Sequence, residues 1–112
     1  NQMRYRQSGT AAVLKFGGTN HFATDEKMMI TMTKDTSRNL VVYKNGNVLT
    51  QTSSTGVPVA SGVFGCDQVG GRSSAPDRDF DGTIFELLLY EKLLSSAELS
   101  GIHSDISARN GL

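Results

Sequence analysis

Closely spaced acidic residues are the first feature of the sequence that could do chemistry. Residues 77–82 read Asp-Arg-Asp-Phe-Asp-Gly, which matches the first six positions of a calcium-binding EF-hand loop. The twelfth position of such a loop carries a bidentate Glu, and here that position is Leu88. The pattern therefore excludes an EF-hand. It leaves Asp77 and Asp79 as candidate ligands of a looser calcium site, against the favoured alternative of solvated acids paired with neighbouring arginines, in which no cofactor is bound.

Catalytic groups are the second feature. Glu86 and Glu91 raise the alternative of a retaining glycosidase, which needs two carboxyl groups about 5 Å apart. Residues five positions apart on a strand project from opposite faces, so this pair does not fit that geometry. His21, His103 and Cys66 show neither zinc-site spacing nor a nucleophile next to a base. We therefore expect no enzymatic activity.

Composition narrows the class of protein further. The chain has 112 residues, 11 basic and 11 acidic side chains and one cysteine. A neutral chain lacks the basic patch of a nucleic-acid-binding protein, and no apolar run reaches the roughly 18 residues of a membrane-spanning helix. One cysteine cannot form a disulfide within the chain. These observations predict one globular domain that neither binds nucleic acid nor inserts into a membrane.

The elements that position these side chains are expected to be mostly strands. Alternating patterns predict strands within residues 3–7, 10–16 and 27–34. Asn45-Gly46 predicts a type I′ turn in a hairpin over residues 40–50. Residues 51–60 are expected to form an exposed edge or loop, and residues 59–69 to contain a further strand.

The last third of the chain contains the most apolar segment, residues 83–90. Its apolar side chains lie on both faces of the expected strand, which predicts a central strand covered on both sides. Ser95 and Glu98 form a capping-box pattern that predicts a helix from residue 96 to about residue 108, ended by Gly111. The predicted fold class is all-β, an antiparallel β-sandwich with one short C-terminal helix packed on its edge.

Two stretches carry a family resemblance. Residues 80–90, FDGTIFELLLY, followed by LSSAEL at 94–99 and RNGL at 109–112, resemble the closing strand and helix of laminin-G-like, concanavalin A-like lectin domains. LVVYKNGNVL at 40–49 is similar to a hairpin of that family. The resemblance implies a jelly-roll sandwich, with residues 1–112 as a single domain that lacks the early strands of the full family fold.

The resemblance also implies a function. It suggests a non-catalytic, lectin-like recognition or adhesion module that binds a glycan or a protein surface within a larger extracellular, cell-surface or virion (phage-particle) protein. The alternative is a structural assembly or decoration module of a virion or surface complex, with no glycan ligand. In both cases we expect a larger polypeptide or an oligomer.

Sugar sites on such folds combine an aromatic ring with Asp, Asn and Arg hydrogen bonds. The aromatic rings that carry a hydroxyl group are those of Tyr5, Tyr43 and Tyr90. The loops at 17–25 and 70–81 hold the polar candidates for ligand contact, which are Asn20, His21, Asp25, Arg72, Asp77, Arg78 and Asp79.

Overall fold

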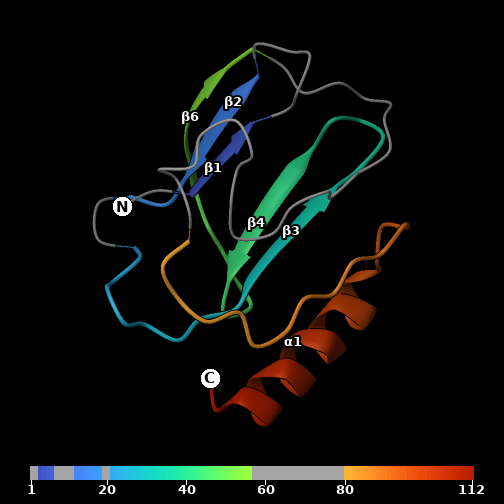
Figure 1. The fold of residues 1–112 in the computed structure, drawn as a ribbon. Helices are drawn as coiled ribbons and strands as arrows, with labels where there is room; N and C mark the ends of the chain where they lie inside the picture. The colour runs from blue at the N-terminus through green and yellow to red at the C-terminus, as the bar shows by residue number, and fades with distance from the viewer. Residues whose placement is uncertain (1–2, 7–11, 19–20, 57–79) are drawn as a thin grey trace. The chain divides into compact units, whose positions relative to one another are not determined.

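The structure is a computed structural model that describes residues 3–6, 12–18, 21–56 and 80–112. The chain divides into two compact units, one formed by Asn1–Ser61 with Leu93–Leu112 and the other by Gly62–Lys92. The described strands and the helix all belong to the first unit (Figure 1). In chain order they are β1 (Met3–Arg6), β2 (Val13–Phe16), β3 (Ile30–Lys34), β4 (Leu40–Lys44), β5 (Asn47–Val48), β6 (Gln51–Thr55) and α1 (Ser96–Asn110).

The first sheet has the strand order β1-β2-β6, and both of its pairings are antiparallel. In β1, Met3 and Tyr5 are half-buried while Arg4 and Arg6 are exposed, so the predicted alternation is confirmed. The strand β6 is exposed along its whole length. The expected exposed edge is therefore confirmed for residues 51–55; the strand expected within 59–69 lies outside the described residues.

The second sheet has the strand order β3-β4-β5 and is also antiparallel. Its hairpin from β4 to β5 turns at Asn45 and Gly46, which have φ of 49° and 80°. A type I′ turn needs positive φ at both central residues, so the predicted turn is confirmed. The Asn45 side-chain oxygen also accepts a hydrogen bond from the Met29 backbone N–H at 2.7 Å, which ties the turn to the chain before β3.

A buried cluster of described residues joins the two sheets. Phe16 from β2 and Val42 from β4 are 2% and 0% exposed, and both belong to it. The other buried members are Ala12, Leu14 and Leu49. Because Val42 belongs to this cluster and Leu40 packs against it, Val41 and Tyr43 lie on the opposite face of the second sheet.

The helix α1 begins and ends where the sequence predicts. Ser95 is the N-cap, its hydroxyl accepts from the Glu98 N–H, and the Glu98 carboxylate accepts from the Ser95 N–H at 2.8 Å. Gly111 ends the helix in the left-handed conformation with φ of 64°. The capping box and the glycine terminator are therefore confirmed, with the helix two residues longer than expected.

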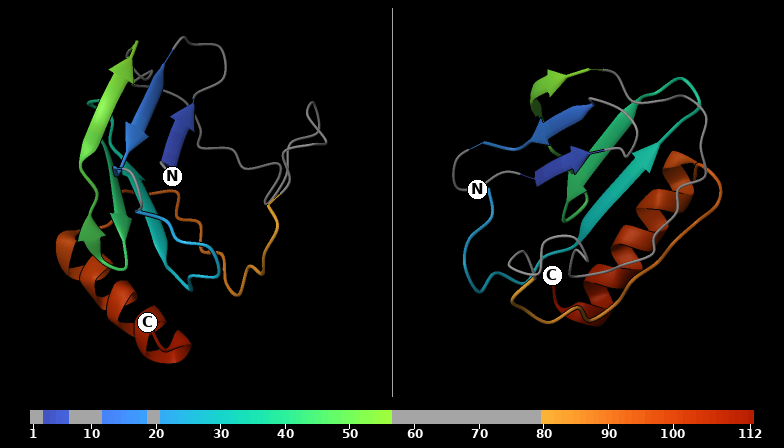
Figure 2. Two further views of the ribbon diagram at one scale, coloured as in Figure 1. Left: turned by 90° about the vertical axis from the view of Figure 1, so that its left-hand side faces the viewer. Right: turned by 45° about the horizontal axis from the view of Figure 1, so that its top comes forward.

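The helix packs on a face of the second sheet, so the expected position on a sandwich edge is wrong. His103 in α1 lies against Thr31 of β3 and Tyr43 of β4, which are cross-strand partners and share one face. In Figure 1 and in both views of Figure 2, α1 runs beside the β3–β4 hairpin. The inner side of the helix carries its two buried residues, Leu99 and His103.

The prediction of a central strand at residues 83–90 is wrong. Residues 80–92 contain no strand, and none of the pairings of the described strands involves them. The side chains from Phe80 to Tyr90 are all exposed. A strand that is apolar on both faces forms only between neighbouring strands and under covering layers, and the pairings of the described strands give this segment no neighbour.

Taken as a whole, the described chain is mostly β, with two small antiparallel sheets and one C-terminal helix. Among the described residues, no helix is both long enough and apolar enough to cross a membrane.

Candidate functional site

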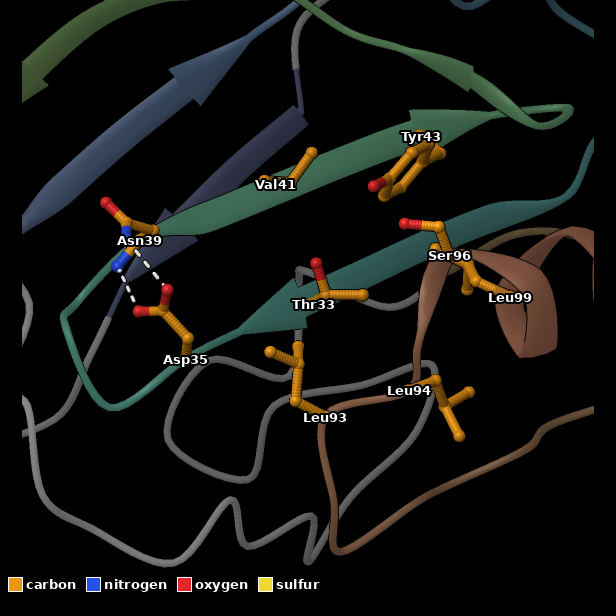
Figure 3. Close-up of a pocket in the computed structure, with 9 residues that line it drawn as sticks. All are labelled: Thr33, Asp35, Asn39, Val41, Tyr43, Leu93, Leu94, Ser96 and Leu99. Carbon is orange, nitrogen blue, oxygen red and sulfur yellow. Dashed lines mark hydrogen bonds between the residues drawn. The ribbon is translucent and has the colours of Figure 1, made fainter.

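The site with the most developed geometry is a pocket between the outer face of the second sheet and the start of α1. Its volume is about 190 Å³. Figure 3 shows the residues that line it. The sheet contributes Thr33, Val41 and Tyr43, which the strand alternation places on the same face as α1. The other lining residues are Asp35, Asn39, Leu93, Leu94, Ser96 and Leu99.

A tight turn between β3 and β4 forms the polar end of this pocket. The Asn39 backbone N–H and side-chain amide donate to the two oxygens of the Asp35 carboxylate at 2.8 and 2.7 Å. These hydrogen bonds lower the pKa of the Asp35 carboxyl, and the one from the Asn39 side chain has the larger effect. Asp35 therefore remains a fixed negative charge at the rim at neutral pH, and its position is set by the turn.

The opposite end of the pocket is the first turn of α1. The free N–H groups of a helix start attract anions, but here the Ser95 hydroxyl already accepts from one of them, the Glu98 N–H, and the Glu98 carboxylate adds a negative charge to the first turn. Leu94 and Leu99 make this wall apolar. The site thus combines an apolar wall, an aromatic ring and one carboxylate, which suits a small ligand with hydroxyl groups and an apolar face.

The loop that carries His21 and Asp25 lies elsewhere in the first unit. The Lys44 ammonium binds the Glu26 carboxylate at 2.6 Å, donates to the His21 backbone oxygen and lies 5.5 Å from the centre of the Phe22 ring. The hydrogen bond from Lys44, together with one from the Ala23 N–H, lowers the pKa of Glu26. The His21 ring itself accepts from the Gly18 N–H at 2.9 Å, so it is used to shape the loop.

The structure describes only some of the residues that are predicted to contact a ligand. His21 and Asp25 are both exposed on this one loop, and Asp25 has a positive φ of 59°. The remaining predicted contacts lie outside the described residues; they are Asn20, Arg72, Asp77, Arg78 and Asp79. The calcium site proposed for Asp77 and Asp79 is therefore untested, and the described residues contain no group of three or more potential metal ligands.

Sequence reasoning missed three residues of this region. Asp35 and Asn39 lie in the connection between two expected strands and His103 lies on the expected helix, and the sequence patterns assign none of them to a site. Alternation in β3 and β4 places Thr31, Thr33, Val41 and Tyr43 on one face, which is a usable signal for a layer above it. The element that covers this face is α1, with His103 at the centre of the contact. Only the tertiary packing shows this.

No family model, no curated protein and no solved structure matches this chain.

Proposed function

We propose that this chain is a non-catalytic recognition module that binds a protein surface, as part of a larger extracellular or phage-particle assembly. The family resemblance of residues 28–112 supports the setting and a concanavalin A-like sandwich for the complete fold. Structural assembly through the same surface is the alternative within this proposal.

One observation carries the proposal, namely the exposed apolar run from Phe80 to Tyr90. Seven large apolar side chains of this run are exposed, from 42% for Leu88 to 68% for Phe85; the others are Phe80, Ile84, Leu87, Leu89 and Tyr90. Scattered exposed apolar residues are ordinary, whereas a contiguous set marks a surface that another protein covers. Burying a Leu or Phe side chain contributes about 1.5–3 kcal/mol, so a few of these side chains suffice for stable binding.

The order of residues in the run defines the chemistry of the partner. Phe85, Leu87 and Leu89 would lie on one face of an extended segment, and Ile84, Leu88 and Tyr90 on the other. Such a segment pairs its backbone and buries both faces when it adds to an open sheet edge that has apolar layers above and below. In the described sheets the outer strands are β1, β6, β3 and β5, so a second copy of the chain offers sheet edges as a partner.

Light scattering of the isolated 112 residues tests this proposal. We expect oligomers whose fraction increases with protein concentration, because copies of the chain cover one another's apolar runs when no other partner is present. The double variant Leu87→Asp, Leu89→Asp is expected to shift the population to monomer, since two carboxylates cannot be buried without partners.

The control is Ser100→Asp, Ser104→Asp, which adds the same charge at two exposed positions of α1. This variant should associate like the unmodified chain. A monodisperse, cooperatively melting monomer of the unmodified chain, or equal loss of association in both double variants, would contradict the proposal.

Glycan binding in the pocket is the second candidate. The Tyr43 ring and the Asp35 and Asn39 polar groups line the same pocket, which favours it, since sugar sites pair a ring with fixed acceptors. At about 190 Å³ the pocket is smaller than drug-sized sites, so it suits a single sugar ring. On a glycan array we expect any bound glycan to be lost in Asp35→Asn and in Tyr43→Phe. If the chain bound nothing on the array, glycan binding would be excluded and protein-surface binding would be the remaining proposal.

A further inference from the structure

His103 occupies an unusual position for a histidine. Among the residues that the structure describes, it is the one buried polar side chain, with 9% exposure. It lies near the middle of α1, where Leu99 is the other buried residue. The contact between the helix and the second sheet is therefore centred on a titratable group.

Three residues of the sheet surround the imidazole ring. Its Nε2 atom is 3.0 Å from the Thr31 hydroxyl oxygen of β3, within hydrogen-bond distance. Its ring meets the Tyr43 ring of β4 edge-on, with 5.4 Å between centroids and 61° between planes. A Cβ atom placed on Gly46, in the turn after β4, would be 3.5 Å from Nδ1, so this turn closes over the other ring nitrogen.

No charged side chain of the described elements compensates a positive charge on this ring. From the sheet, Tyr43 is the titratable group that faces it, and Lys44, its neighbour in β4, points to the other face and pairs with Glu26. On α1, Glu98 binds Ser95, and Asp105 pairs with Arg109 at 2.8 Å. Burial accordingly lowers the pKa of His103.

We propose that His103 is an acid-sensitive latch, whose protonation releases α1 from the β3–β4–β5 sheet and removes the helix wall of the pocket. A neutral imidazole offers one donor and one acceptor, whereas imidazolium carries two donors and a charge that little water reaches at this buried contact. Because Ser96 and Leu99 of α1 line the pocket opposite Tyr43, release of the helix opens it. The inference goes beyond the proposed function and does not depend on it.

The direction of the pH dependence follows from linkage. The pKa of His103 lies below its ordinary value of 6.5 when α1 is docked. The undocked state therefore binds the proton more tightly, and docking is at full strength above pH 6.5 and weakens as the pH falls below it. The carboxyls of Glu26 and Asp35, whose pKa values are lowered from 4.5 and 3.8, affect stability only in a more acidic range.

Amide hydrogen exchange of the full chain at about pH 7.5 and about pH 5.5, corrected for intrinsic rates, tests the latch. We expect the α1 amides to lose protection at the lower pH, by up to about tenfold per pH unit below 6.5, the limit for one proton. The amides of β2 and β4 should keep theirs. Equal loss in the sheets and the helix would indicate general unfolding and overturn the proposal.

Two variants separate His103 from other titrating groups. His103→Gln keeps a hydrogen-bonding side chain for Thr31 but cannot be protonated, so the pH effect on α1 should disappear. His21→Gln, at the exposed histidine, should retain it. If His103→Gln does not fold, NMR titration of the unmodified chain decides: the His103 ring and the α1 amides must change at the same midpoint. A pH effect that survives in His103→Gln, or separate midpoints, would overturn the latch.

Discussion

Replacing Phe16 by alanine is expected to lower the free energy of unfolding by about 3–5 kcal/mol. Phe16 is 2% exposed and belongs to the cluster that joins the two sheets. Removing its ring loses the burial of an aromatic side chain and leaves a cavity in the cluster that also contains Leu14 of β2 and Val42 of β4. A loss of this size is a large fraction of the 5–15 kcal/mol that typically stabilises a domain.

Urea unfolding followed by circular dichroism measures this effect, with Val48→Ala as the matched control. Val48 lies in β5 and is 64% exposed, so its truncation should change the free energy of unfolding by no more than about 0.5 kcal/mol. If Phe16→Ala cost no more than Val48→Ala, the shared core between the sheets would not exist as described.

Replacing Gly46 by valine is expected to cost about 1 kcal/mol or more of folding free energy, through the turn that joins β4 to β5. Gly46 has a φ of 80°, a conformation that a β-branched side chain adopts only under strain. A Cβ at this position would lie at ordinary contact distance from His103 and would not clash with it. The strained backbone conformation therefore accounts for the cost that any side chain would bring at Gly46. The γ-methyl groups of valine would then press on the α1 contact.

Thermal melts of three variants separate these contributions. Gly46→Ala carries the backbone strain alone, and Gly46→Val adds the γ-methyl groups. Gly101→Ala is the control with the opposite sign, because Gly101 is an exposed helical position with nothing within 4 Å of its Cβ site. Alanine there should stabilise α1 by about 0.5–1 kcal/mol. Gly46 variants as stable as the unmodified chain would contradict the assigned turn.

The sequence by itself determined the parts of this protein that depend on near neighbours. The α1 boundaries follow from Ser95, Glu98 and Gly111, because capping contacts join residues three to five positions apart. The Asn45-Gly46 turn follows from the positive φ that these residues tolerate. The alternation of β1 likewise identified its buried side, since one strand's pattern is enough to separate two faces.

Only the tertiary structure decided what depends on distant partners. The segment at 83–90 has the composition of a central strand, yet it lies exposed, because pairing and cover come from other elements and not from its own residues. No sequence pattern assigns His103 a contact, and it becomes the buried contact because Thr31 and Tyr43, 72 and 60 positions earlier, share one sheet face. The pocket beside it exists for the same reason: its two walls meet only after β3, β4 and α1 have packed.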